Sequence, residues 1–133
     1  MQDVFNPTNQ EIREWAYSNG SYPEEDWDIV VFHDVTDDGL TALILDIATD
    51  KNCPKQKTFV HFLDIITGAV VRYAAEKGYN EEELKKLNTL IADAEKKSSP
   101  LVIDWANRTK QIIQFPERFR YKDWFLEKTT AAL

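Results

Sequence analysis

The segment between Pro54 and Gly78 constrains the fold most, because a helix drawn through it is apolar on nearly every side. Its apolar side chains are Phe59, Val60, Phe62, Leu63, Ile65, Ile66, Ala69, Val70, Val71, Tyr73 and Ala74. Proline favours the first turn of a helix and glycine favours its end, so the sequence predicts a helix over residues 54–77. At about 1.5 Å per residue, this helix would span roughly 35 Å. Other helices must cover such a segment, and we expect it at the centre of an all-α fold.

Capping patterns and prolines mark the helices on either side. Thr8 and Asn80 each begin a capping box, in which a polar side chain and a glutamate three residues later satisfy free amides at a helix start. Pro100 predicts a helix over residues 100–114, and an apolar stretch predicts a short buried helix over residues 40–49. The side chains expected to face the core are Ile12, Trp15, Ala16, Leu84, Leu87, Ile91, Ala94, Leu101, Trp105 and Ile112. A final helix or turn-rich segment should bring further residues back to the core: Phe119, Tyr121, Trp124, Phe125 and Leu126.

Residues 28–33 can be read in two ways. A helix starting at Pro23 can run through Val31, but the β-branched run 29–32 also fits a buried strand, and periodicity does not separate the two. In either case the expected architecture is a single domain, residues 1–133. It would be an irregular bundle of six or seven mostly antiparallel helices around the central apolar one.

Charge is distributed very unevenly along the chain. The net charge is −7, yet residues 1–50 hold twelve carboxylates and one base, whereas residues 51–133 hold eleven carboxylates and fifteen bases. Seven of the acids fall between positions 24 and 38: Glu24, Glu25, Asp26, Asp28, Asp34, Asp37 and Asp38. Acids at helix starts are one explanation, but these do not account for the absence of Lys and Arg from Glu14 to Asp50. The alternative is a surface that meets a cationic partner, with Trp27 as its anchor, since Trp is frequent at binding hot spots.

Residues suited to catalysis or metal binding are few. Asp46 and Asp50 are one turn apart, as are His61 and Asp64, and two antiparallel helices could bring all four together as a metal site or an acid–base pair. No second histidine accompanies them at ligand spacing, so we expect no metal, no cofactor and no catalytic residues. Cys53 beside His33 or His61 could form a nucleophilic pair, but no accompanying motif supports it. As the one cysteine it cannot form an internal disulfide, and we expect a cytoplasmic protein.

Nucleic acid and membrane are not expected as partners. Arg118, Arg120 and Lys122 alternate with Phe119 and Tyr121, which is a pattern found in single-strand binding, but three bases are few against a net charge of −7. We therefore expect the two aromatic rings to point inward. No uninterrupted apolar run reaches the ~20 residues of a membrane span, and the first residues lack the basic and apolar regions of a signal peptide.

Several short phrases resemble a known group of proteins. They are Pro7-Thr8-Asn9-Gln10-Glu11-Ile12, Trp15-Ala16-Tyr17, Glu25-Asp26-Trp27-Asp28, Cys53-Pro54-Lys55 and Phe119-x-Tyr121-x-Asp123-Trp124. Together they are similar to a family of small all-helical bacterial proteins of uncharacterised function. The resemblance implies a helical fold in a bacterial cytosol. In size, class and charge the chain is also similar to the helical immunity proteins that block bacterial toxins.

From these features we expect an acidic protein-interaction module rather than an enzyme. Its specific form would be an immunity protein that covers the active site of a cationic nuclease toxin, because nucleases need positive clefts for phosphate. The alternatives are a structural or scaffold domain and, less favoured, an enzyme using the carboxylate–histidine group.

Overall fold

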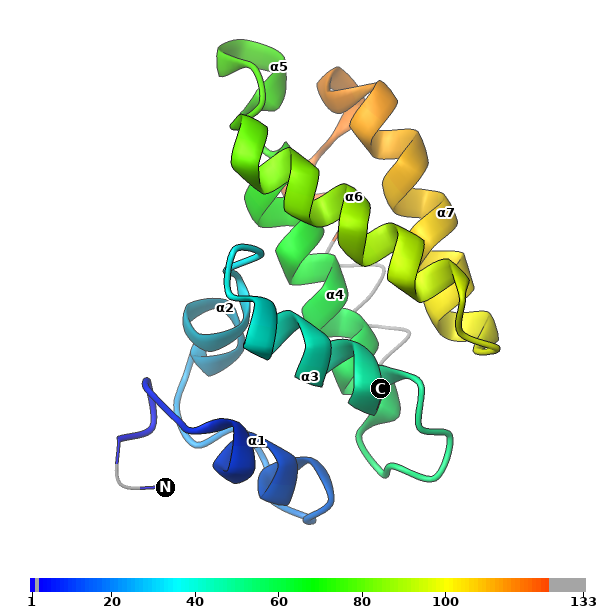
Figure 1. Ribbon diagram of the computed structural model, residues 1–133. Coiled ribbons are helices and arrows are strands. Elements are labelled where there is room, and N and C mark those ends of the chain that lie inside the picture. The colour runs from blue at the N-terminus through cyan, green and yellow to red at the C-terminus, as the bar shows by residue number, and fades with distance from the viewer. Residues whose placement is uncertain (2, 125–133) are drawn as a thin grey trace.

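The computed structural model describes residue 1 and residues 3–124, and over these it contains helices and no strand. The helices are α1 (Asn9–Ala16), α2 (Trp27–Phe32), α3 (Asp38–Ala48), α4 (Gln56–Val71), α5 (Ala74–Lys77), α6 (Glu81–Glu95) and α7 (Pro100–Gln114), followed by the 3₁₀ turn η1 (Pro116–Arg118) (Figure 1). This confirms the predicted all-α bundle. It also decides between the two readings of residues 28–33, because residues 28–32 belong to helix α2 and His33 is its C-cap.

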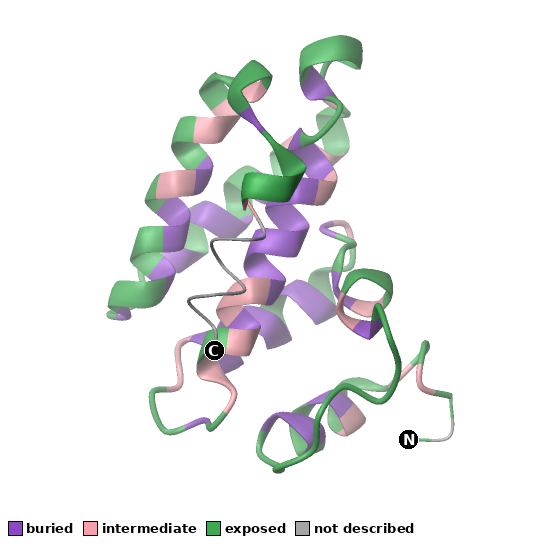
Figure 2. Cartoon of the chain, turned by 180° about the vertical axis from the view of Figure 1, so that it is seen from behind, coloured by how far each residue is buried: buried purple, intermediate pink, exposed green. Residues whose placement is uncertain are grey.

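Helix α4 forms the centre of the bundle, as its composition predicts. It packs against α2, α3, α6 and α7, and buried positions follow it along most of its length (Figure 2). Helices α1–α3 form one group on α4 and helices α6–α7 form a second. The extensive helix contacts join α1 to α3, α6 to α7, and α2, α3, α6 and α7 to α4, whereas contacts between the two groups are weaker. Helix α4 therefore joins two packing units.

The central helix is shorter than predicted. It begins at Gln56, two residues after Pro54, and ends at Val71. At Tyr73 the backbone leaves the helical region (φ −112°, ψ 3°) and its carbonyl starts the new turn of α5, so residues 54–77 are not one uninterrupted helix. Gly78 ends α5 with φ at +76°, a conformation that favours glycine. The stretch Gln56–Lys77 is long and apolar enough to cross a membrane. The central helix of a soluble fold can have the same length and composition, and 67% of the 18 most apolar residues in a row are buried inside this fold.

Two of the predicted helix starts are present with their caps. The Thr8 hydroxyl accepts a bond from the Glu11 amide at 3.1 Å, and the Glu11 carboxylate accepts one from the Thr8 amide at 2.9 Å. The Asn80 side chain accepts a bond from the Glu83 amide at 3.0 Å, which is the N-cap bond of the box predicted there. The helix expected from Pro23 begins only at Trp27, because Asp26 adopts a left-handed conformation (φ 60°) that interrupts any helix upstream.

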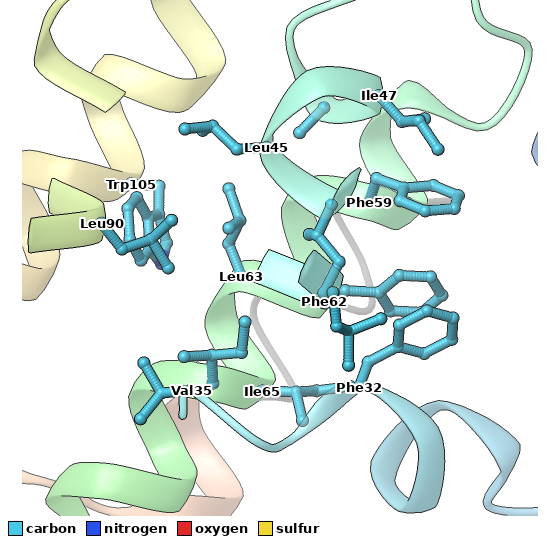
Figure 3. Close-up of a cluster of buried hydrophobic side chains, with 14 of the residues drawn as sticks. Phe32, Val35, Leu45, Ile47, Phe59, Phe62, Leu63, Ile65, Leu90 and Trp105 are labelled. Carbon is cyan, nitrogen blue, oxygen red and sulfur yellow. The ribbon is translucent and has the colours of Figure 1, made fainter. Parts of the chain in front are cut away.

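A cluster of aromatic rings joins α1, α2 and α4. Phe32 of α2 stacks on Phe62 of α4 with ring centroids 3.8 Å apart and planes 8° from parallel (Figure 3). Trp15 and Trp27 meet edge to face at 4.7 Å, and Phe59 packs against Phe62 at 4.8 Å. These rings hold the short helix α2 against the central helix.

Two predictions about inward faces are wrong. Leu101 is 38% exposed because α7 buries Val102, Trp105, Ala106 and Thr109, a stripe offset from the predicted one. In the last segment Phe119 is buried and Trp124 packs partly against the core, but Tyr121 is 41% exposed. Two further expected core residues, Phe125 and Leu126, lie outside the described part of the chain.

Candidate functional site

Helix α2 presents apolar side chains to solvent. It has six residues, and Trp27 and Phe32 at its two ends are both 0% exposed. Between them, Ile29 and Val30 face outward with 40% and 47% of their surface exposed. The aromatic cluster fixes which side of α2 points inward, so the remaining side displays this aliphatic pair.

Acidic side chains border this aliphatic pair along the chain. We define the α2 surface as the exposed residues that belong to or flank the helix: Glu24, Glu25, Asp26, Ile29, Val30, Asp34, Asp37 and Asp38. Three of the acids come directly before the helix and three come after it. The result is an apolar centre between two acidic segments, with no Lys or Arg in this part of the sequence.

Three of these acids also have structural tasks. Asp37 caps α3 by accepting a bond from the Leu40 amide at 3.1 Å. Asp34 accepts bonds from the hydroxyl and amide of Thr36, and these bonds lower the pKa of Asp34. Asp38 pairs with Lys86 of α6 at 2.8 Å. Among the residues that the structure describes, Glu24, Glu25 and Asp26 form no ion pair with any other.

Asp28 belongs to an internal contact and not to the exposed surface. Its carboxylate lies 3.2 Å from Nε2 of His61 on α4, and both side chains are mostly buried. Burial acts to raise the pKa of Asp28, but the hydrogen bonds from His61 and from the Ile29 amide outweigh it and lower the pKa. The pair holds α2 against α4. The prediction that Asp28 belongs to the partner-binding surface is therefore corrected, because its carboxylate faces His61 inside the fold.

The prediction that Trp27 anchors a partner on an exposed surface is also corrected. Its side chain is completely buried, and its indole N–H donates to the backbone carbonyl of Val4 at 2.5 Å. A flanking acidic sequence does not determine exposure, because the ring is covered by Trp15 of α1 and by Phe32 at the other end of α2. Ile29 and Val30 take the place of Trp27 as the exposed apolar centre.

The four residues proposed for chemistry are not brought together. Asp46 pairs with Arg13 at 3.1 Å, and Asp50 accepts a bond from the hydroxyl of Tyr17 at 2.5 Å. His61 faces Asp28, and Asp64 pairs with Arg108 of α7. Within the described residues, no group of three or more His, Cys, Asp or Glu side chains is arranged to hold a metal ion. Asp46 and Asp50 instead join the end of α1 to the end of α3, His61 joins α4 to α2, and Asp64 joins α4 to α7.

Cys53 is placed as a structural side chain. Its thiol is buried and lies 3.3 Å from the carbonyl oxygen of Ala16. Burial raises the pKa of Cys53, although a position near a helix start by itself lowers the pKa of a thiol. Nδ1 of His33 contacts the Ile29 carbonyl at 2.9 Å, and His61 contacts Asp28, so neither imidazole is bonded to the thiol.

A buried ion pair between α4 and α7 was not foreseen. Asp64 is 0% exposed, and its carboxylate lies 3.0 Å from the guanidinium of Arg108, which also bonds Asp104 at 2.8 Å. Burial acts to lower the pKa of Arg108, but the charges of Asp64 and Asp104 outweigh it and raise the pKa. An aspartate inside the apolar central helix was the available signal, but nothing in the sequence indicated Arg108 as its partner.

An open groove of about 1110 Å³ separates α6 from α1 and α3. The buried side chains of Leu43, Leu45 and Leu90 contribute to its lining, and charged residues of both signs surround them. The ion pair between Asp38 and Lys86 crosses from one side to the other. Because its charges are mixed, the groove favours no ligand of one sign, and the α2 surface remains the candidate site.

No protein family, curated protein or solved structure matches this chain.

Proposed function

We propose that the α2 surface is a docking site for a basic protein. The observation that carries the proposal is an exposed aliphatic pair, Ile29 and Val30, set between carboxylates in a sequence segment without a single Lys or Arg. Protein interfaces commonly have an apolar centre and a polar rim. The charge of the rim selects the partner, because an acidic rim attracts a cationic surface and repels an anionic one.

Different residues of the surface have different roles in this proposal. Glu24, Glu25 and Asp26 are exposed and form no ion pair within the described residues, so they are available to a partner without breaking an existing contact. They should act mainly on the association rate, which long-range attraction increases by ~10–10³-fold in favourable cases. Ile29 and Val30 should act mainly on dissociation, because their burial is lost only when the complex separates.

The specific form of the proposal is an immunity protein for a nuclease toxin. A nuclease cleft is positive because it holds phosphate groups, and an acidic helical surface of this kind competes for it. The small size, the all-helical fold and the net charge of −7 support this form. The proposal puts the complex in the cytoplasm and includes no catalytic step by this chain, since the residues considered for chemistry serve separate contacts.

The test compares two sets of variants against a purified partner. Proteins retained by the immobilised chain from a lysate of its host are purified, and their binding kinetics are measured between low and physiological salt. The triple variant Glu24→Gln, Glu25→Gln, Asp26→Asn should slow association, and most strongly at low salt. Asparagine is chosen at position 26 because it tolerates the left-handed backbone found there. The double variant Ile29→Ala, Val30→Ala should increase the dissociation rate.

A matched control removes the same number of exposed carboxylates from other helices. The control is Glu76→Gln, Glu81→Gln, Asp93→Asn, which lies on α5 and α6. Because its net charge equals that of the test variant, any difference in association reflects where the charges lie. Equal association rates for the two variants would contradict the proposal and leave a scaffold role. A partner that is a basic nuclease, and whose activity this chain inhibits, would support the immunity form.

A further inference from the structure

A second charged surface lies where the ends of α4, α5 and α7 meet. We define the basic–aromatic end as eight exposed residues: Arg72, Tyr73, Lys77, Phe115, Arg118, Arg120, Tyr121 and Lys122. They come from two stretches of sequence that the fold brings together through packing of α5 against η1. In Figure 1, α5 and the C-terminal end of α7 lie at the same end of the molecule, and α1 lies at the other.

The cations and rings of this end are in contact with one another. The Arg72 guanidinium lies 4.5 Å from the ring centre of Tyr73 and 5.8 Å from that of Tyr121. Arg118 lies 4.2 Å from the ring centre of Phe115. Tyr73, Phe115 and Tyr121 remain 52%, 39% and 41% exposed, so each keeps ring surface open to solvent beside a positive charge.

The five cationic side chains of this end, three arginines and two lysines, form no ion pair with another residue of the described chain. By contrast, Arg13, Lys86 and Lys110 are each paired with a carboxylate elsewhere on the surface. Three acids, Glu76, Glu117 and Asp123, lie in the same stretches, so the local balance remains positive. Cationic groups are therefore available here to an anionic ligand.

We propose that the basic–aromatic end binds single-stranded nucleic acid. Unpaired bases stack on exposed aromatic rings and phosphates meet nearby cations, which is the combination found here. An acidic protein would use the charges but not the rings, and a duplex keeps its bases away from them. The sequence alone indicates three cationic side chains here, Arg118, Arg120 and Lys122, and on that basis predicts no binding of nucleic acid. The fold adds Arg72 and Lys77, together with the rings of Tyr73 and Phe115, and exposes Tyr121.

The net charge of −7 does not prevent this binding. Exposed charges farther apart than about 8–10 Å are largely screened at physiological ionic strength. The acids of the α2 surface belong to other elements than the basic–aromatic end, whose two stretches of sequence carry five cations and three carboxylates, so the charge close to a strand bound there is positive. Binding at this end is a separate property from docking of a basic protein on the α2 surface, and either can fail without the other.

Fluorescence anisotropy of a labelled 12-nucleotide poly-dT strand, titrated with the full chain at low salt, tests the proposal. We expect saturable binding that is weaker for a duplex of equal length. The logarithm of the affinity should fall linearly with the logarithm of the salt concentration, with a slope of about −0.7 per phosphate contacted. With five cationic side chains at this end, the slope should be no steeper than about −3.5. Tyr73→Ala should weaken binding ~5–100-fold through lost stacking, and Tyr73→Trp should retain it.

Charge variants separate this site from general attraction. Arg118→Gln, Arg120→Gln should weaken binding and reduce the salt slope, whereas Lys51→Gln, Lys57→Gln removes two exposed bases from elsewhere and should change neither. Circular dichroism confirms that each variant is folded. Equal losses in the two double variants, absence of binding at low salt, or equal affinity for poly-glutamate of the same charge would each overturn the proposal. The last result would indicate an acidic protein partner.

Discussion

Replacing Arg108 with methionine should destabilise the protein strongly, because it removes the guanidinium that pairs with the buried carboxylate of Asp64. Asp64 is 0% exposed and Arg108 is 22% exposed, with 3.0 Å between their charged atoms. Removing one partner of a buried ion pair costs about 3–5 kcal/mol, since the remaining charge has lost both water and its counter-ion. In a chain of 133 residues this loss corresponds to a decrease in Tm of roughly 10–20 °C.

Two further variants isolate the cause. Asp104→Asn removes the other carboxylate bonded to Arg108, but that side chain is 63% exposed, and an exposed pair contributes only about 0–1 kcal/mol. The double variant Asp64→Asn, Arg108→Met removes both buried charges together. It should recover much of the stability lost in Arg108→Met, because replacing a whole buried pair costs far less than breaking it.

Urea unfolding followed by far-UV circular dichroism measures these differences, since urea does not screen charge as guanidinium salt does. The expected order of stability is wild type, Asp104→Asn, the double variant and finally Arg108→Met. The reasoning is refuted if Arg108→Met is no less stable than Asp104→Asn, or if the double variant is no more stable than Arg108→Met.

Three other predictions follow from the packing and the pKa shifts. Phe62→Ala should cost about 3–5 kcal/mol in urea unfolding, whereas the same change at the exposed Phe5 should stay within about 0.5 kcal/mol. The hydrogen bond to Asp50 raises the pKa of Tyr17 to about 12, so absorbance titration of Asp50→Asn should show that one tyrosine ionising nearer its usual pH of ~10. The pKa of Asp28 is lowered in the fold, so its contribution to stability is present above its unfolded pKa of about 4 and is lost as the pH falls through the folded value. The urea midpoint should therefore fall less between pH 7 and pH 3 in Asp28→Asn than in the wild type.

The helices with local start signals were predictable from the sequence. The caps at Thr8 and Asn80 and the proline at position 100 act within one turn of chain, and α1, α6 and α7 begin where these residues predict. The start of α2 was misplaced because the left-handed backbone at Asp26 has no comparable sequence signal. The break at Tyr73 was missed because an apolar sequence continues through it.

The candidate site was harder to predict because it depends on contacts between distant segments. The acidic segment was recognisable from composition, but the burial of Trp27 depends on Trp15 and on the carbonyl of Val4. The exposure of Ile29 and Val30 follows only once that ring is fixed. The basic–aromatic end likewise needs packing between α5 and η1, which no spacing along the chain reveals.

The position of α4 between two packing units also determines how amide hydrogens exchange with solvent. Helices α1–α3 and helices α6–α7 each pack mainly on α4 and on members of their own group, so each group can open while the other stays intact. The central amides of α4, near Leu63 and Ile66, are protected by both groups. They should exchange most slowly and report global unfolding, whereas each outer group exchanges through its own partial opening.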